Sequence, residues 1–162
     1  MPPTGPAPDA AFIEKLRQSG IRVDREGRFM HEGAEVTHEG LRRALFRWLD
    51  RNGDGRYVLR LDERRFAYLD VDDTPLVARA ARVDATGRIV LALSDGAEEP
   101  LDPTTLTLDE AGTLRAWVRG GRLEARLASS AAAALGDLIV DEGAGPSLRV
   151  GATIVRLRPR SS

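Results

Sequence analysis

The sequence predicts an α+β fold of two related units, each a curved antiparallel sheet covered by one helix. Residues 38–51 and 130–142 have the apolar periodicity of helices. Short runs rich in branched apolar residues, bounded by Gly, Asp or Asn, predict strands around both helices. The order of turn, helix and hairpin occurs twice at a nearly constant separation, which indicates a repeated unit. A helix on one face of a sheet is a stable two-layer arrangement.

The N-terminal residues predict a tail and a short helix. Residues 1–8 contain four prolines, which indicates a flexible tail. Asp9 is expected to cap a helix that ends at Gly20. One face of that helix would carry Phe12, Ile13 and Leu16. Two strands are then expected at 21–24 and 28–30, on either side of a turn at 25–27.

The clearest helix prediction covers residues 38–51. An apolar stripe runs along one face through Leu41, Ala44, Leu45, Trp48 and Leu49. The other face carries arginines, which we interpret as a solvated surface. Thr37 is the predicted N-cap, and Gly53 or Gly55 is expected to end the helix.

The rest of the chain predicts strands and a second helix. The expected strands are 57–61, 65–71, 76–83, 88–93, 106–108, 114–118, 122–127, 148–150 and 153–157. The second helix, 130–142, would be capped by Ser129 or Ser130 and end at Gly143. The turn-rich segment 94–105 is the predicted domain boundary. The expected organisation is a tail at 1–8, an N-terminal unit at 9–93, a connector at 94–105 and a C-terminal unit at 106–160.

Composition excludes several classes of function. The chain has 162 residues, 42% of them hydrophobic and 30% charged, with a net charge of −1. That charge provides no global field for nucleic acid or an anionic membrane, and no apolar run is long enough to span a bilayer. The absence of cysteine excludes disulfides, thiolate catalysis and Cys-ligated metals. Residues 1–10 lack the features of a signal peptide, so we expect a cytoplasmic protein.

Several segments resemble a bacterial family known as domain of unknown function 1285. The segments are IRVDREGRFMHEGAEVTHEGLRRALFRWLDRNGDGRYVL, DVDDTPLVARAARV, AWVRGGRLEARL and GATIVRLRP, which together span about residues 20–158. Similar short motifs stand at 31–33, 73–77 and 118–121. Phe29 stands where the family has tryptophan, and the closing segment lacks the family's aromatic ending. The resemblance implies a two-part fold with a repeated motif, a signalling or regulatory role, and no established activity, catalytic residue or cofactor.

The sharpest candidate metal site is the segment 50–55, DRNGDG, which fits the start of a calcium loop. Oxygens of Asp50, Asn52 and Asp54 could converge on one hard cation. Leu61 stands at the twelfth position, where such a loop needs a bidentate glutamate, and a strand is expected to follow instead of a helix. The alternative is a polar turn that ends the helix.

His31 and Glu32 are candidate ligand-binding residues. The chain has two histidines, His31 and His38, with Glu35 and Glu39 nearby, and such a cluster can bind zinc, manganese or iron. The intervening strand and turn do not fit a metalloprotease motif. The alternative is that both histidines are structural or lie at the surface.

Other charged residues carry no recognisable catalytic pattern. The adjacent acids at 62–63, 72–73 and 98–99 are interpreted as solvated turn residues. Arginines alternate along 115–126 and 149–160, which we interpret as protection of edge strands. We therefore expect a non-catalytic ligand-binding or regulatory module without a cofactor. It would bind a small molecule or a protein partner and could form a homodimer. The alternative is a metal-dependent protein or enzyme that uses His31, Glu32 and nearby acids.

Overall fold

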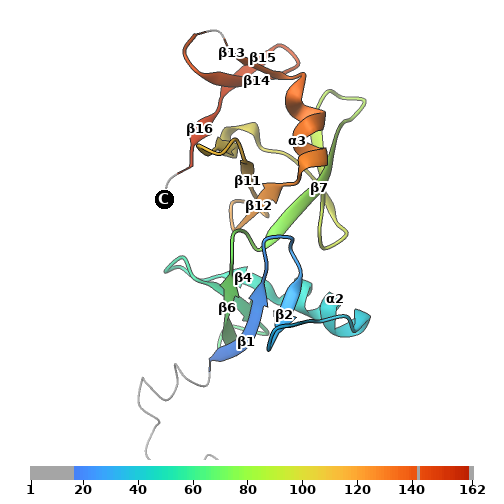
Figure 1. The fold of residues 1–162 in the computed structure, drawn as a ribbon, viewed down its shortest axis with the longest axis vertical. Helices are drawn as coiled ribbons and strands as arrows, with labels where there is room; N and C mark the ends of the chain where they lie inside the picture. Colours follow the sequence, from blue (N-terminus) through green and yellow to red (C-terminus); the bar gives the residue numbers. More distant parts are fainter. Residues whose placement is uncertain (1–16, 142, 161–162) are drawn as a thin grey trace, which may run out of the picture.

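The computed structural model describes residues 17–141 and 143–160. Within these ranges the chain forms three sheets, two α-helices and one short 3-10 helix. The six-stranded sheet and its helix occupy the lower half of Figure 1, and the other two sheets occupy the upper half. Neither helix has the length and apolar character needed to cross a membrane.

The six-stranded sheet has the strand order β3-β2-β1-β6-β5-β4. Its strands are β1 (Gln18–Val23), β2 (Phe29–His31), β3 (Ala34–Glu35), β4 (Leu49–Arg51), β5 (Tyr57–Arg60) and β6 (Phe66–Val71). All neighbours are antiparallel except β1 and β6, which run parallel. Helix α2 (Glu39–Trp48) packs against β5, so the sheet carries its helix on one face.

Helix α2 confirms the predicted apolar stripe only in part. Leu45 is buried and Ala44 and Trp48 are half-buried, but Leu41 is 44% exposed. The helix also has different ends. Its N-cap is His38 and not Thr37, because His38 Nδ1 accepts a hydrogen bond from the Leu41 N–H at 3.1 Å. The helix ends at Trp48, short of the predicted glycines. Residues 49–51 form strand β4 instead, since they pair with β5 in an antiparallel register. Sheet pairing here overrides a helical pattern that Leu49 alone would continue.

The seven-stranded sheet has the order β16-β10-β11-β12-β7-β8-β9. Its strands are β7 (Leu76–Val83), β8 (Ile89–Leu93), β9 (Glu98–Pro100), β10 (Thr107–Leu108), β11 (Leu114–Val118), β12 (Leu123–Leu127) and β16 (Arg158–Pro159). The pairs β12–β7 and β10–β16 are parallel and join strands far apart in the sequence. The 3-10 helix η1 (Pro103–Thr105) precedes β10.

The second helix is shorter than predicted. Helix α3 (Ser129–Gly136) packs on β7 and β12, and its N-cap is Ala128, which makes no side-chain capping bond. Residues 139–141, predicted as helix, form the first strand of the three-stranded sheet because they pair with the strand that follows. That sheet consists of β13 (Ile139–Asp141), β14 (Pro146–Val150) and β15 (Thr153–Arg156). The apolar residues at 135, 138 and 139 fit the helical period, so pairing with β14 and not the local pattern makes 139–141 a strand.

The α+β class is confirmed, whereas the arrangement in two related units is not. Strands β7, β8 and β9, which lie before or within the predicted connector 94–105, share one sheet with β10, β11 and β12. The connector itself contributes β9 and η1. The two large sheets are also mixed and not purely antiparallel. The predicted helix at 9–16 lies outside the described residues, and its expected end, Gly20, lies in strand β1.

Buried apolar side chains form two clusters, one for each half of the molecule. The smaller cluster lies between α2 and the six-stranded sheet and contains Val23, Phe29, Leu45, Leu59 and Leu69. The larger cluster fills the other half, from Leu76 on β7 to Leu157 before β16. Phe46, Leu49 and Tyr57 pack against both clusters. These three side chains therefore give the two halves a direct apolar contact.

Candidate functional site

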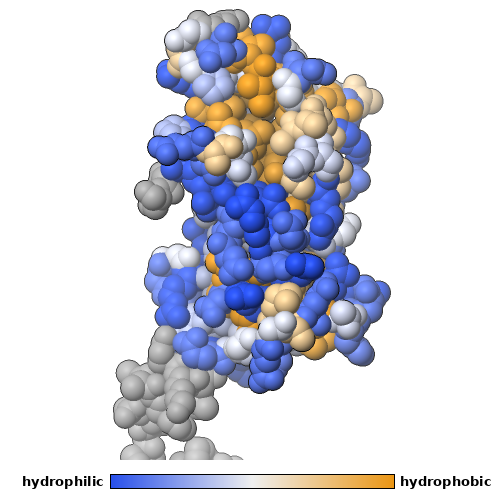
Figure 2. Space-filling model, in the orientation of Figure 1, coloured by the Kyte–Doolittle hydropathy of each residue, from blue (hydrophilic) through white to orange (hydrophobic). Residues whose placement is uncertain are grey.

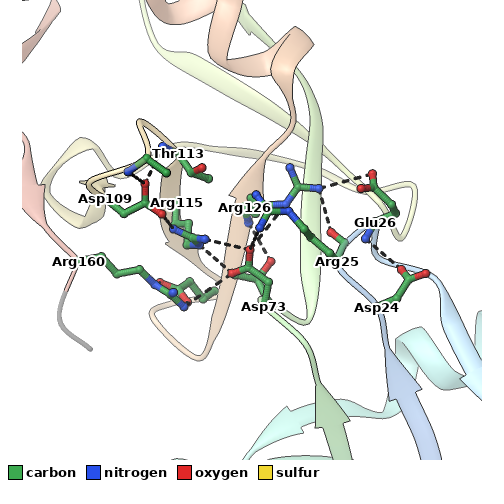
Figure 3. Close-up of polar contacts among 12 residues, drawn as sticks. Asp24, Arg25, Glu26, Asp73, Asp109, Thr113, Arg115, Arg126 and Arg160 are labelled. Atoms are coloured by element: carbon green, nitrogen blue, oxygen red, sulfur yellow. Dashed lines mark hydrogen bonds and ion pairs between the residues drawn. The ribbon is translucent and has the colours of Figure 1, made fainter.

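A network of arginines and acids, buried at its centre, lies where the two large sheets meet. We call it the Asp73 network and define it as Arg25, Asp73, Asp109, Arg115, Glu124, Arg126 and Arg160 (Figure 3). In the space-filling view, hydrophilic side chains gather in a band across the middle of the molecule (Figure 2). A buried charged group requires a partner of opposite charge or a hydrogen bond.

Asp73 is the centre of the network. It follows β6 and leads into β7, so it lies on the direct connection between the sheets. Its side chain is 6% exposed and that of Arg115 is 5% exposed. The guanidinium of Arg115 donates two hydrogen bonds to it, from Nε at 2.8 Å and Nη2 at 2.9 Å. Arg25, Arg126 and Arg160 also lie 3.8–3.9 Å from its carboxylate oxygens.

The arginines around Asp73 have further acidic partners. Arg115 Nη1 donates to Asp109 Oδ2 at 2.7 Å, and Arg160 Nη2 donates to Glu124 Oε1 at 2.8 Å. The bidentate pair of Arg115 with Asp73 fixes geometry as well as charge. Strands β11 and β12 supply Arg115 and Glu124, and the segment after β16 supplies Arg160. The network therefore connects these segments of the seven-stranded sheet to Asp73, between β6 and β7.

Arg126 joins the network to the hairpin turn between β1 and β2. Its Nη2 donates to the backbone oxygen of Arg25 at 2.8 Å, and its N–H donates to Thr74 Oγ1 at 3.0 Å. Its Nε is buried without a hydrogen bond and lies 3.9 Å from Asp73 Oδ2. A buried donor without a hydrogen-bond acceptor is energetically unfavourable, so Arg126 Nε is the least satisfied group of the network.

A recurring hairpin turn explains why Asp109 is available to Arg115. The turns begin at Asp24, Asn52, Asp84 and Asp109, and in each a glycine three residues later donates its N–H to the backbone oxygen of the first residue. These glycines have φ of +82° to +89°, a region that glycine adopts without strain. The first residue also donates its own N–H to the residue four positions on. The turn is thus a repeated local unit.

The Asp109 copy differs from two others at its fifth position. In the Asp24 and Asp84 copies an arginine occupies that position and pairs with the aspartate Oδ2, at 2.8 Å for Arg28 and 3.4 Å for Arg88. The Asp109 copy has Thr113 instead, whose N–H donates to Oδ1 at 2.8 Å. Asp109 Oδ2 is thereby left to accept from Arg115.

The surroundings keep Asp73 ionised. Burial raises the pKa of Asp73. The hydrogen bonds and charge of Arg115, followed by the charges of Arg160 and Arg25, lower it by more, so the pKa lies below the ordinary value. The hydrogen bonds that Arg115 donates to Asp73 in turn raise the pKa of Arg115. The pKa of Asp109 is also lowered, first of all by its hydrogen bond from Arg115.

These pKa shifts predict acid sensitivity. A carboxyl whose folded pKa is depressed contributes stability above its unfolded pKa, about 3.9, and that stability is lost as pH falls through the folded pKa. We expect the free energy of unfolding to be flat from pH 7 to about 5 and to fall below about 4. Urea unfolding at a series of pH values measures it. The Asp73→Asn variant should show a shallower acid limb, and an identical limb in both proteins would contradict the assignment.

A pocket of about 340 Å³ opens beside the network. It is lined by Arg25, Asp72, Asp73, Arg115 and Arg160. Arg115 and Asp73 are committed to each other, as described above. Arg25 is different: its side chain is 59% exposed, and its guanidinium contacts Asp73 at 3.8 Å without a hydrogen bond to any described residue. Asp72 is also a pocket residue without a hydrogen-bonded partner for its carboxylate in the described ranges, with Arg22 Nε at 3.6 Å.

Asp50, Asn52 and Asp54 lie at and after β4, in the Asn52 copy of the hairpin turn. Arg60 Nε donates to Asp50 Oδ2 at 2.9 Å, and Arg122 also pairs with this carboxylate. The Asn52 amide oxygen accepts from Arg60, and Asp54 Oδ1 accepts the Arg56 N–H at 3.0 Å. No group of three or more His, Cys, Asp or Glu side chains in the described ranges has a metal-binding arrangement. Calcium binding at these residues stays a prediction.

Asp50 also links the two halves of the molecule. Arg122 lies in the turn between β11 and β12, in the other sheet. Next to it, Arg51 Nη2 donates to the Gly121 oxygen at 3.0 Å and its guanidinium lies 4.6 Å from the centre of the Trp117 ring. Burial raises the pKa of Asp50, but the Arg51 N–H and then Arg60 and Arg122 lower it below the ordinary value. This second polar contact supports the junction away from Asp73.

His31 and Glu32 lie in the hairpin between β2 and β3. His31 is the last residue of β2, and its ring lies over Gly20, within 3.7 Å of where a Cβ would be. Glu32 and Gly33 form the two-residue turn, both with positive φ, and Glu32 is exposed. His38 uses its Nδ1 to cap α2. Their role in ligand binding stays a prediction.

Sequence reasoning misread the residues of the Asp73 network. The acids at 72–73 were expected to be solvated, but Asp73 is buried because Arg115 covers it. Arg115 and Arg126 were interpreted as protecting edge strands, but β11 and β12 lie inside the seven-stranded sheet and both side chains are buried. The available signal was a charge within each apolar run, LRAWV and LEARL, since a buried charge predicts a buried partner.

Comparisons with known proteins identify the fold. No protein-family model and no curated protein matches the sequence. A crystal structure of a DUF1285 family protein from Silicibacter pomeroyi DSS-3 is 21% identical, with a TM-score of 0.73 over 97% of this chain and 90% of that one. A DUF1285 family protein from Shewanella baltica OS155 is 15% identical, with a TM-score of 0.57 over 68% and 84%. The resemblance to this family expected from the sequence is confirmed at the level of fold.

Proposed function

We propose that the protein is a non-catalytic ligand-binding module that takes a small molecule with an anionic group in the pocket beside the Asp73 network. The observation that carries the proposal is the lining of this pocket, which three arginines share with two acids. Ligand sites often lie where separate structural layers meet, and this pocket draws on both large sheets. A ligand held there would contact both halves of the molecule, which suits a regulatory role.

Arg25 is the residue best suited to hold the anion. Arg115 has all three guanidinium nitrogens hydrogen-bonded to Asp73 and Asp109, so it has little left to offer. Arg160 is held by Glu124. Arg25 lies on a rigid hairpin turn, and its guanidinium keeps its donors for a ligand. A planar guanidinium binds carboxylate or phosphate oxygens in a bidentate manner.

The acids of the pocket suit binding better than catalysis. Asp73 has a lowered pKa and both oxygens accept from Arg115, so it is a weak base that holds no proton to donate near pH 7. Neither histidine lines the pocket. The charged groups there hold each other in place, which favours recognition of a ligand over proton transfer.

The test is binding of simple anions to Arg25→Gln. Propionate, 4-methylpentanoate, 3-phenylpropionate and inorganic phosphate would be titrated calorimetrically into the wild type and the variant. We expect at least about a tenfold loss of affinity, since one hydrogen bond to a charged group contributes about 1.5–3 kcal/mol. The matched control is Arg43→Gln, which removes an exposed arginine on α2 and should leave affinity unchanged. Equal affinity in both variants, or a wild type that binds no compound with a carboxylate or phosphate group, amino acids included, would overturn the proposal.

A further inference from the structure

Asp72 gives the same pocket a negative charge that the protein does not use. Its backbone N–H donates to the Val23 oxygen at 2.9 Å, which fixes its position after β6. Its carboxylate is 41% exposed and accepts no hydrogen bond from the described residues. The nearest cation is Arg22 Nε at 3.6 Å, and both side chains of this pair are largely in water, where such a pair contributes little. Asp72 is therefore free to accept hydrogen bonds from a ligand.

We infer that the ligand of this pocket is a zwitterion of the α-amino acid class, with its carboxylate on Arg25 and its ammonium on Asp72. The inference rests on the proposed function and adds the second charge of the ligand. Two of the five lining residues remain available after the internal pairs are set aside, and they carry opposite charges. They come from neighbouring segments, the β1–β2 turn and the residue after β6.

The charges of the pocket discriminate between ligand classes. Arg115 is neutralised by Asp73 and Asp109, and Arg160 by Glu124. A simple anion on Arg25 would meet the repulsion of Asp72, and a simple amine on Asp72 would meet that of Arg25. A molecule with both charges avoids each repulsion, because complementary charges favour the correct partner and like charges reject the others. A pocket of about 340 Å³ also has room for a side chain.

The experiment compares amino acids with the acids that lack only their amino group. L-Alanine with propionate, L-leucine with 4-methylpentanoate and L-phenylalanine with 3-phenylpropionate would be titrated into the wild-type protein at pH 7. We expect at least one amino acid to bind ten times more tightly than its partner acid. In Asp72→Asn the two should respond differently, with the amino acid bound more weakly and the acid bound equally or more tightly. A purely structural role of Asp72 would move both in the same direction.

Glu63→Gln is the matched control. Glu63 is an exposed acid in the turn before β6, whereas Asp72 follows the other end of that strand, on the order of 20 Å away. The control should leave the amino-acid preference intact. If every acid binds as tightly as its amino acid and depends on Arg25, the inference is overturned and the proposed function stands. If no compound binds, both are overturned. The wild-type comparison decides this whether or not Asp72→Asn folds.

Discussion

Replacing Asp73 with asparagine is expected to destabilise the protein by about 3–5 kcal/mol, the range seen when one partner of a buried ion pair is removed. The change leaves Arg115 buried beside Arg126 and Arg160 without the central negative charge. Each kcal/mol corresponds to roughly 2–4 °C in Tm for a chain of this size. Urea unfolding at pH 7, followed by circular dichroism, measures the loss.

Asp72→Asn is the control for this substitution, because it makes the same chemical change one residue away. Asp72 is partly exposed and has only a long contact with Arg22, so its replacement should change stability by less than about 1 kcal/mol. The double variant Asp73→Asn/Arg115→Met should lose less than the sum of the single changes, because the two residues interact directly. Similar losses in Asp73→Asn and Asp72→Asn would show that Asp73 does not hold the junction.

Replacing Phe29 with alanine is expected to destabilise the six-stranded half by about 3–5 kcal/mol, as large-to-small changes in a core do. Phe29 is 2% exposed, and its ring meets that of Phe46 edge to face with centroids 4.7 Å apart. The cavity would lie between α2 and the sheet, in the smaller apolar cluster. The measurement is again urea unfolding.

Phe66→Ala provides the comparison for Phe29. Phe66 lies on β6, is only partly buried and has Arg17 and Arg60 over its ring. Its loss should be clearly smaller than that of Phe29. An equal loss would argue against a core role for Phe29. Because Phe29 stands where the resembling family has tryptophan, its burial indicates that this position fills the core and does not line the pocket beside Asp73.

Local sequence patterns predicted helices and strands well where the apolar face of the element determines its secondary structure. The strand bounds 76–83 and 114–118 match β7 and β11, and α2 buries Leu45 from the predicted apolar stripe. The prediction failed at the helix ends. After Trp48 and after Gly136, strand pairing with a later segment takes residues that the helical period would also fit. Such pairing is a tertiary effect that a short window does not contain.

The candidate site was not predictable from local patterns because its members are far apart in the chain. Asp73 meets Arg115 and Arg126 only through the parallel pairing of β7 with β12, and Arg160 only through that of β10 with β16. Turn chemistry alone predicts acids at such positions to be solvated. The repeated unit expected from element order is not confirmed, although one type of hairpin turn does recur, beginning at Asp24, Asn52, Asp84 and Asp109.

The pairing of β10 with β16 has a consequence for the order of events on the ribosome. Every strand of the six-stranded sheet has been made once residue 71 is synthesised, whereas the seven-stranded sheet lacks its last strand until residue 159. Folding during translation proceeds from the N-terminus, so the first sheet can form early. Once residue 73 has also been made, the nascent chain holds Asp73 with Arg25 already present and Arg115, Arg126 and Arg160 still to come. The junction that carries the pocket is therefore the last part of the molecule to mature.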